Sequence, residues 1–333
     1  MLAEADILAL SLLSKITAAE VIALSSSAES LEDALSIIGR HEMDLRDVVQ
    51  RQQQRCTERG VRIIPFCHPL YPARLRAITR RPAVLYVLGE MPAEVIPMIG
   101  VVGTRSCSVQ YGKPVTDLFV GAWGRMGCGI VSGLANGIDM IAHEASLRSG
   151  ASTIAVIASG IDRITPIPAQ RMAERIASRS GCVVSEYPCG VAALPPYFPA
   201  RNRIISGMSD AVVVVESKQT GGALITAEFA IEQGRPLYAV PGPVTSDRSA
   251  GCNNLIAEKK AQLLRWPEEV VRGSESHAAC AEPGAVAPSR VVTAEEAATL
   301  WKCSLPEALS RLFTLEMNGL ANAMPGGRYV VRE

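Results

Sequence analysis

Apolar residues recur with two different periods along the chain, and the change of period divides it. Up to about residue 60 they recur every three or four positions, which predicts short helices and a small helical domain over residues 1–60. From residue 61 to about residue 265, short runs rich in β-branched residues alternate with helical patterns. The residues on the two predicted helical faces of the first part are Leu8, Leu12, Leu13 and Ile16, and Leu31, Leu35 and Ile38.

Seven apolar runs in the second part are predicted to be strands. They cover residues 83–89, 96–103, 129–133, 152–160, 182–188, 211–217 and 235–242. Strands that alternate with helices at this spacing indicate βαβ units and a mostly parallel sheet. The runs are apolar at successive positions, as expected when helices cover both faces of the sheet. The sequence therefore predicts a doubly wound α/β domain over residues 61–265.

The remaining residues predict a linker and a third domain. Residues 273–289 are rich in Gly, Ala, Ser and Pro, which is typical of a flexible linker, and we assign the linker to residues 266–289. Residues 290–333 predict two helices and a β-hairpin, the outline of a winged helix-turn-helix. Both helices begin with a candidate capping box, and the second is expected to end at Asn318-Gly319. The two capping boxes are Thr293 with Glu296 and Ser304 with Glu307.

The second of these helices has few of the side chains that read DNA. It carries one positive residue, Arg311, against Glu307 and Glu316. A recognition helix for duplex DNA normally presents several positive or amide side chains. We therefore favour a protein–protein role for the winged helix over DNA reading.

Composition limits the possible functions. The 333 residues carry a formal net charge of zero, so any site for a polyanion must be a local cluster. The nine cysteines show no Cys-x-x-Cys pair, which disfavours a disulfide framework or a zinc site and indicates a reducing, cytoplasmic location. The N-terminus lacks the pattern of a secretory signal, and no apolar run is long enough to cross a membrane. No cofactor or metal motif is present, so neither is expected.

Glycine-rich and polar segments follow five of the predicted strands: "GTRS", "SGLANGID", "SEYP", "ESKQTGG" and "VPG". The carboxyl ends of parallel strands meet at one edge, where doubly wound sheets bind ligands. Glycines let a backbone approach a phosphate closely, and the helices that follow present free N–H groups. Arginines add charge, and an aromatic ring can stack on a base. These features predict a single-strand nucleic-acid site at Gly103, Thr104, Arg105, Ser106, Gly133, Gly137, Phe198, Arg201, Arg203, Gly221 and Gly222.

Evidence for catalysis is weaker. Asp139 and His143 are four residues apart on a predicted helix and could touch, but no nucleophile motif accompanies them, so a helix-packing pair is favoured. Neither the dinucleotide pattern G-x-G-x-x-G nor the P-loop pattern occurs. The protein is therefore expected not to be an enzyme.

The motif blocks resemble the DNA-processing protein A (DprA/Smf) family. They are "YPARL", "PAVLYVLG", "GVVGTRSCSVQYG", "SGLANGID", "IAVIASGID", "SEYP", "FPARNRIISGMSDAVVVVE", "TGGALITAEFA", "GRPLYAVPG" and "GCNNLI", in family order over about residues 70–265. The resemblance implies a Rossmann-like fold and binding of single-stranded DNA without sequence preference during natural transformation. It also implies protection of that strand, loading of RecA recombinase and a homodimer. The implied partners include single-strand-binding protein.

The resemblance also implies which residues line the strand-binding pocket. They are Arg105, the block with Phe198, Arg201, Asn202 and Arg203, and the flanking loops Ser132–Asn136 and Thr220–Gly222. Many relatives carry a basic residue where this chain has Asn136. That asparagine is predicted either to border the groove or to cap the following helix.

One enzyme family remains as an alternative. "GGALITAE" resembles the Gly-Gly-x-Gly-Thr-x-x-Glu signature of nucleoside-monophosphate phosphoribohydrolases and keeps Gly221, Gly222 and Glu228 in spacing. Leu224 and Ile225 stand where that signature has its phosphate-binding Gly-Thr. A nucleotide-processing enzyme or a nucleotide sensor is therefore the second hypothesis.

Overall fold

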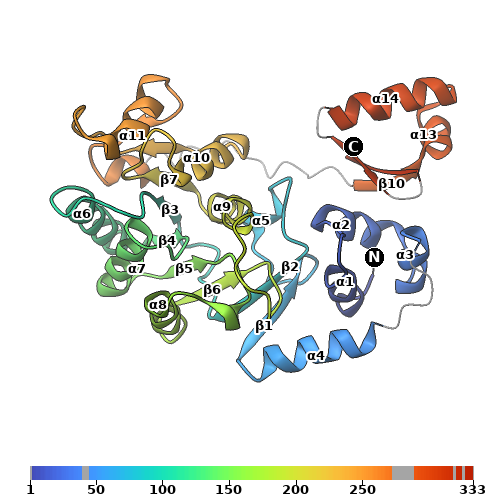
Figure 1. Ribbon diagram of the computed structural model, residues 1–333, viewed down its shortest axis with the longest axis horizontal. Helices are drawn as coiled ribbons and strands as arrows, with labels where there is room; N and C mark the ends of the chain where they lie inside the picture. The colour runs from blue at the N-terminus through green and yellow to red at the C-terminus, as the bar shows by residue number, and fades with distance from the viewer. Residues whose placement is uncertain (1, 40–44, 272–288, 318–319, 325–326, 333) are drawn as a thin grey trace.

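The computed structural model describes residues 2–39, 45–271, 289–317, 320–324 and 327–332 (Figure 1). The predicted linker from residue 272 to residue 288 and the predicted helix end at Asn318-Gly319 lie outside the described residues. Residues just before residue 272 still belong to the α/β domain. Val270 is fully buried in its core, and the Trp123 indole donates a hydrogen bond of 2.8 Å to the Pro267 carbonyl. Packing of this domain therefore continues past the predicted boundary at residue 265.

The predicted α/β sheet is present and is mostly parallel. Its strands lie in the order β1-β2-β6-β5-β4-β3-β7-β8-β9, and neighbours from β6 to β9 run parallel. The two strands at the β1 edge pair antiparallel. The strands are β1 (Val61–Pro65), β2 (Val84–Gly89), β3 (Met98–Val102), β4 (Gly129–Ser132), β5 (Thr153–Val156), β6 (Gly181–Ser185), β7 (Ala211–Val214), β8 (Leu237–Ala239) and β9 (Gln262–Leu263). All seven predicted strands occur, mostly shorter than expected, and β1 and β9 were not predicted.

The central strand β3 shows why the predicted runs are apolar at successive positions. Ile99 and Val101 of β3 pack into one hydrophobic cluster, whereas Met98 and Val102 pack into another on the opposite face. Helices α6 (Gly112–Arg125) and α7 (Ile138–Ser149) cover the first face. Helices α9 (Tyr197–Gly207) and α10 (Gly222–Glu232) cover the second (Figure 1). Both faces are therefore dry, as the pattern predicted.

Two further helices and two short ones belong to the α/β domain in the described residues. Helix α8 packs against β5 and β6, and α11 packs against β8. Their bounds, with those of the short helices α5 and η1, are α5 (Ala73–Arg76), η1 (Ile161–Arg163), α8 (Ile167–Ala177) and α11 (Asp247–Ala257).

The N-terminal residues form helices, but the first one is shorter than predicted. The helices are α1 (Glu4–Ser11), α2 (Ala18–Ser27), α3 (Leu31–Ile37) and α4 (Arg46–Thr57). Ile16 lies between α1 and α2, because Thr17 and Glu20 form a capping box that starts a new helix. Leu10 and Leu24 of these helices join the same core as Leu85 of the sheet. The helices are thus bound to the α/β domain by shared apolar packing.

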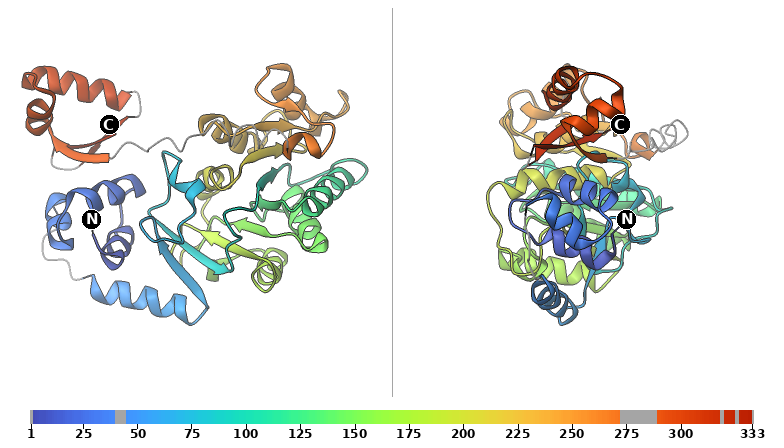
Figure 2. Two further views of the ribbon diagram at one scale, coloured as in Figure 1. Left: turned by 180° about the vertical axis from the view of Figure 1, so that it is seen from behind. Right: turned by 90° about the vertical axis from the view of Figure 1, so that its right-hand side faces the viewer.

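The C-terminal residues form the predicted helices and hairpin. The elements are β10 (Ser289–Thr293), α13 (Ala294–Trp301), α14 (Leu305–Met317), β11 (Ala321–Met324) and β12 (Arg328–Arg332), with strand order β10-β12-β11. Thr293 and Glu296 form the predicted reciprocal capping box. At the second site Glu307 accepts hydrogen bonds from Ser304 N and Oγ. This unit packs on the N-terminal helix α2, where Val291 N donates to Ser27 Oγ at 3.4 Å (Figure 2).

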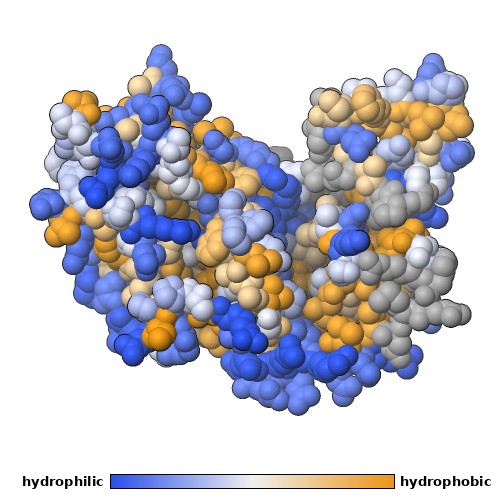
Figure 3. All heavy atoms as spheres, in the orientation of Figure 1, coloured by the Kyte–Doolittle hydropathy of each residue, from blue (hydrophilic) through white to orange (hydrophobic). Residues whose placement is uncertain are grey.

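The second helix of this unit, α14, presents apolar side chains to solvent (Figure 3). Leu309, Phe313 and Met317 are 44%, 64% and 73% exposed, and the Arg311 guanidinium lies 4.6 Å from the Trp301 ring centroid. Its exposed face therefore differs from the polar face of a DNA-reading helix.

Two kinds of feature are absent from the described part of the chain. No helix there is long and apolar enough to span a bilayer. Within the same residues, no three His, Cys, Asp or Glu side chains lie together as a metal site.

Candidate nucleic-acid interface

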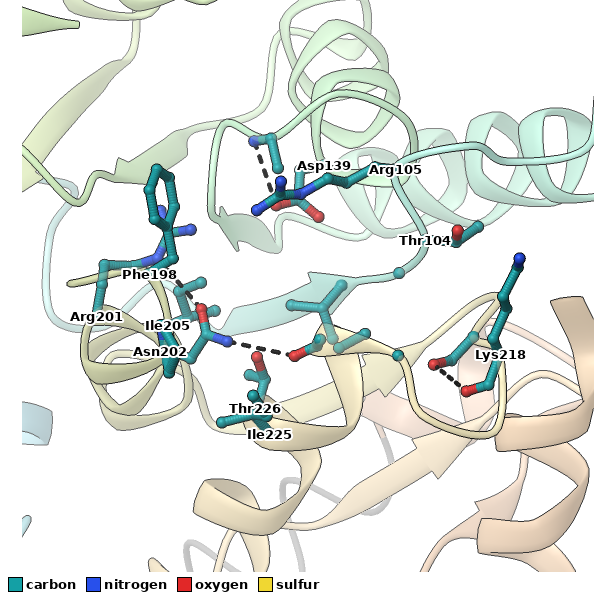
Figure 4. A pocket seen from close by; sticks show the side chains of 18 of the residues that line it. Thr104, Arg105, Asp139, Phe198, Arg201, Asn202, Ile205, Lys218, Ile225 and Thr226 are labelled. Atoms are coloured by element: carbon teal, nitrogen blue, oxygen red, sulfur yellow. Dashed lines mark hydrogen bonds between the residues drawn. The ribbon is translucent and has the colours of Figure 1, made fainter. Parts of the chain in front are cut away.

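A pocket of about 730 Å³ opens where the strand order reverses (Figure 4). The chain places β4, β5 and β6 on one side of β3 and then returns to place β7, β8 and β9 on the other. Ligands of doubly wound sheets bind at such a reversal, beyond the strand carboxyl ends. Its lining comes from the loops after β3, β4 and β7, from the start of α7, from α9 with the residue Pro195 before it, and from α10. The lining residues are Val102–Ser106, Ala135, Asp139, Pro195, Phe198, Pro199, Arg201, Asn202, Ile205, Ser217, Lys218, Thr220–Ala223, Ile225 and Thr226.

The loop after β3 is held by backbone hydrogen bonds to both sides of the reversal. Thr104 N donates to the Glu216 carbonyl at 2.7 Å, and the Thr104 carbonyl accepts from Ile138 N at 3.3 Å. Gly103 allows this close approach, since a Cβ at that position would lie 2.5 Å from Ile138 Cγ1. A fixed loop therefore presents the exposed Arg105 to the pocket.

Arg105 lies over an aromatic ring from α9. Its guanidinium carbon is 5.6 Å from the centroid of Phe198, within the range of a cation–π contact. Both side chains also border a second cavity of about 290 Å³, next to the first. The pair thus presents a positive charge and a flat apolar face together, which suits a phosphate and a neighbouring base.

The loop after β7 adds a second cation and a helix N-terminus. The exposed Lys218 lines the pocket, and Figure 4 shows it entering from a different loop than Arg105. Helix α10 begins after Gly221, and no side chain caps it. The unpaired N–H groups of a helix start, together with the positive end of its dipole, attract anions. Sequence reasoning missed Lys218, although it lies in the quoted "ESKQTGG" segment at a strand carboxyl end.

One face of α9 supplies the inner wall of the pocket. Phe198, Arg201, Asn202 and Ile205 follow the i, i+3, i+4, i+7 spacing of a helical stripe, and all four line the pocket. Asn202 Nδ2 reaches the Gly222 carbonyl at 3.4 Å, which links α9 to the start of α10. The stripe therefore joins the ring of Phe198, the aromatic platform of the pocket, to the start of α10, which follows the loop that carries Lys218.

Arg201 is a buried support of the pocket. It is 5% exposed, and its Nη1 donates to the carbonyls of Gly133, at 2.6 Å, and of Val156. Burial lowers the pKa of Arg201 to about 10, so the guanidinium remains charged near neutral pH. It ties the ends of β4 and β5 to α9 and adds positive potential beneath the pocket.

Arg203, predicted as a pocket residue, points elsewhere. It lies two residues from Arg201, so the two side chains leave α9 on different sides. Its guanidinium forms two hydrogen bonds of 2.6 Å with the carboxylate of Glu186, and its Nε donates to the Arg80 carbonyl at 2.7 Å. It borders a small separate cavity with Thr79. The structure therefore assigns Arg203 to a buried ion pair, and its placement in the strand-binding pocket is corrected.

Asp139 and His143 are buried, as a packing pair would be, but they bind different partners. Asp139 Oδ2 accepts from Gly133 N at 3.2 Å and from Ala135 N at 3.4 Å. Burial raises the pKa of Asp139 to about 6. His143 Nδ1 lies 2.7 Å from Thr153 Oγ1, and burial lowers the pKa of His143 to about 3. Asp139 lines the pocket floor, a position that sequence reasoning did not assign to it.

The loop after β4 lies mainly beside the smaller cavity. Gly133 and the exposed Asn136 line that cavity. Ser132 is fully buried and donates to the Val101 carbonyl at 2.6 Å, so it braces β3 and β4 from inside. The N-cap of α7 is Gly137, with no side-chain cap, so the capping alternative for Asn136 is wrong.

Two of the five predicted loops do not line the main pocket. The "SEYP" residues at the end of β6 supply Glu186 to the ion pair with Arg203. In the segment after β8, Gly242 N donates to Asn253 Oδ1 at 3.2 Å. These loops hold neighbouring elements in place.

The fold and the pocket together define a Rossmann-like protein with a cationic, aromatic groove at the strand carboxyl ends. The family model of DNA recombination-mediator protein A matches residues 62–275. Protein Smf of Escherichia coli (strain K12) is 35% identical over 286 residues, which are 80% of this chain and 76% of that protein. The DNA processing protein DprA of Streptococcus pneumoniae is 42% identical over 201 residues, 60% of this chain and 70% of that protein. The chain belongs to the DNA recombination-mediator protein A family.

Two solved structures of such proteins are similar to this one. The X-ray structure of DNA processing protein A from S. pneumoniae covers 82% of this chain and 98% of its own, with a TM-score of 0.68 and 31% identity. A structure of DNA processing protein A from Helicobacter pylori, described for its single-stranded DNA binding mode, covers 62% of this chain and 93% of its own. Its TM-score is 0.55 and its identity 26%.

Proposed function

We propose that the groove binds single-stranded DNA without sequence preference. The observation that carries the proposal is the joint presence of Arg105, Lys218 and the uncapped start of α10 around one pocket, beside the exposed ring of Phe198. The cations and the helix start bind phosphates of any sequence. A ring stacks on any base, typically with ~1–3 kcal/mol per base. The H. pylori relative, described for its single-stranded DNA binding, supports the same function here.

A pair of matched variants tests the proposal. Lys218→Ala removes a cation of the groove, and Arg148→Ala removes an exposed arginine at the far end of α7, where it pairs with Asp117. Lys218→Ala should weaken binding to labelled oligonucleotides of different sequences by about the same factor. It should also reduce the salt slope, which is the fall in log affinity per log unit of salt concentration, by roughly 0.7. Arg148→Ala should change neither quantity, and equal effects of both variants would argue against the groove.

The finer part of the proposal concerns what happens to the bound strand. We infer that the protein is a cytoplasmic homodimer that protects the strand and loads RecA recombinase onto it, also where single-strand-binding protein covers it. The support is membership of a family described as recombination mediators. RecA filament growth on strands coated with single-strand-binding protein should start sooner when this protein is added. An unchanged lag would remove the loading step while leaving strand binding intact.

The enzyme alternative has less support in the pocket geometry. Glu228, the retained acid of the phosphoribohydrolase signature, is exposed on α10 and does not line the pocket, whereas the apolar Ile225 does. An apolar side chain cannot replace the phosphate contacts of Gly-Thr. We therefore expect no release of base from nucleoside monophosphates incubated with the protein.

A further inference from the structure

Two cysteines that are far apart in the sequence meet in the interior. The sulfur atoms of Cys56, in the last turn of α4, and Cys189, after β6, lie 3.7 Å apart. The two residues are 1% and 3% exposed and are separated by 133 positions in the chain. The described residues contain eight cysteines, and Cys56 and Cys189 are the two whose sulfur atoms are in contact with each other.

The surrounding residues hold α4 and the segment around Cys189 against each other. With its amide turned to match its neighbours, Gln52 accepts from Cys189 N at 2.8 Å and donates to the Cys189 carbonyl at 3.2 Å. The next residue, Gly190, has φ +99°, and a Cβ there would lie 2.8 Å from Arg55 Nη1. Its N–H also donates to Asp162 Oδ1 at 2.7 Å. One turn of α4 is thus fitted closely to the segment around Cys189.

The contact links the N-terminal helices to a segment that leads into the groove. Cys189 lies three residues after Glu186 in the segment that follows β6, and this segment continues through Pro195 of the pocket lining to α9, which carries Phe198. Helix α4 otherwise meets the α/β domain mainly at the edge strand β1. A covalent bond here would therefore tie an edge element to the segment that carries the aromatic platform.

The chemistry of the two thiols is matched for bond formation. The Cys56 thiol donates a hydrogen bond to the Cys189 sulfur, which lowers the pKa of Cys189 and raises that of Cys56. A thiolate is the reactive form of cysteine, so the lowered pKa favours Cys189 over Cys56 as the first nucleophile. In a disulfide the two sulfur atoms lie about 2.05 Å apart, so bond formation draws these sulfurs together from their present contact of 3.7 Å.

We propose that Cys56 and Cys189 are an oxidant-sensitive dithiol that peroxide converts into a disulfide staple between α4 and the segment after β6. The Cys189 thiolate attacks one peroxide oxygen, the O–O bond breaks, and a sulfenic acid forms with release of hydroxide, which becomes water on taking up a proton. The Cys56 sulfur then attacks the sulfenic sulfur, forms the S–S bond and releases a second water. Two thiols lose two electrons in all, and one peroxide is reduced to two waters. This proposal does not depend on the proposed DNA binding.

The disulfide staple should be detectable as a specific crosslink, and it should raise the melting temperature. A bond that closes a loop this long restricts the unfolded chain strongly. The full-length protein, reduced and then titrated with hydrogen peroxide, should yield a peptide crosslinked between Cys56 and Cys189. Its melting temperature should rise by several degrees, and dithiothreitol should reverse the rise. The matched variants Cys56→Ala and Cys189→Ala should each lose the rise, whereas Cys128→Ala, which removes another buried cysteine, should keep it.

The wild-type peptide map decides the proposal even if a variant fails to fold. Half-buried cysteines such as Cys67 and Cys107 provide an internal reference for complete oxidation. The proposal is overturned if Cys56 and Cys189 remain free thiols, or carry only separate oxidation products, once those reference cysteines are fully oxidised. It is equally overturned if the crosslink forms without a reversible rise in melting temperature.

Discussion

The guanidinium of Arg105 lies 5.6 Å from the centroid of the Phe198 ring and joins the loop after β3 to helix α9. The two residues are 93 positions apart in the chain, and each borders both cavities of the groove. The positive charge and the apolar ring face therefore lie at one place in the pocket. Their separate contributions to strand binding can be distinguished, because charge affects the salt dependence and stacking does not.

Phe198→Ala should weaken binding of a single strand by ~1–3 kcal/mol and leave the salt slope unchanged, because it removes a stacking face. Arg105→Ala should weaken binding to all sequences about equally and lower the slope by roughly 0.7 log unit per log salt. Fluorescence anisotropy over a salt series measures both quantities. Phe313→Ala, which removes an exposed ring from α14, is the control and should bind like the wild type. A lower slope for Phe198→Ala would contradict the division of roles.

Arg203 should contribute to folding and not to strand binding. Removal of one partner from a buried ion pair typically costs about 3–5 kcal/mol. Arg203→Ala should therefore lower the free energy of unfolding by about this amount, because it leaves Glu186 without its partner. The folded protein should keep its affinity for the strand. Chemical denaturation and binding below the melting temperature measure the two effects.

The double variant Arg203→Met with Glu186→Leu provides the control for that prediction. It removes both charges and fills similar volume, so much of the lost stability should return. If either variant bound single strands several-fold more weakly while fully folded, Arg203 would belong to the groove after all.

The fold was easier to predict than the site. Val212 and Val213 of β7 face opposite sides of the sheet and are both buried, so the apolar runs identify strands covered by helices. The strands β1 and β9 were missed for different reasons. In β1, Arg62 interrupts the apolar pattern, and β9 contains only two residues. Local patterns thus identify a strand when its burial is uniform and its length is sufficient.

The site depends on side-chain directions that the residue types alone do not reveal. Arg201 and Arg203 have the same chemistry, but Arg201 supports the pocket and Arg203 pairs with Glu186, which lies 17 positions earlier in the chain. The helical spacing of Phe198 and Asn202 could have excluded Arg203, because residues two apart face different sides. The place of Asp139 in the pocket lining could not have been predicted, since it depends on how Arg201 and the loop after β4 are arranged around it.

Asp139 should make stability depend on pH. Its pKa in the folded protein is about 6, above the usual 3.8, so the folded state holds the proton more tightly than the unfolded state does. The tighter proton binding stabilises the folded state fully below about pH 4. This stabilisation is lost as the pH rises through about 6, and the free energy of unfolding falls by about 2–3 kcal/mol in all. Asp139→Asn has no such proton to lose. The stability of the wild type relative to Asp139→Asn should therefore fall between pH 4 and pH 7.

Denaturant titrations of both proteins across this pH range measure the difference. His143 makes stability depend on pH in the opposite direction. Its pKa is lowered to about 3, so its contribution is present above about pH 6.5 and is lost as the pH falls. It occurs in both proteins and cancels in the comparison. A difference that stayed constant over this range would show that the buried carboxyl titrates normally.

Asn136→Lys should tighten strand binding without loss of stability. The side chain is exposed beside the smaller cavity, and Gly137 is the N-cap of α7, so no capping bond is removed. An added charge next to a bound phosphate should raise affinity a fewfold at low salt and steepen the slope by roughly 0.7 log unit per log salt. Gln54→Lys, which adds the same charge to α4, is the control. Unchanged affinity of Asn136→Lys would place the strand outside this cavity.

The central claim is that the groove binds single strands, and competition against a duplex tests it most directly. A labelled single strand bound to the full-length protein is titrated with unlabelled single strand or with duplex of the same sequence, at one fixed salt concentration. A stacking platform requires unpaired bases, whose faces a duplex keeps stacked on one another. The single strand should therefore compete at far lower concentration than the duplex, and Phe198→Ala should narrow the gap. Equal competition by both forms, with the gap unaffected by Phe198→Ala, would contradict the account.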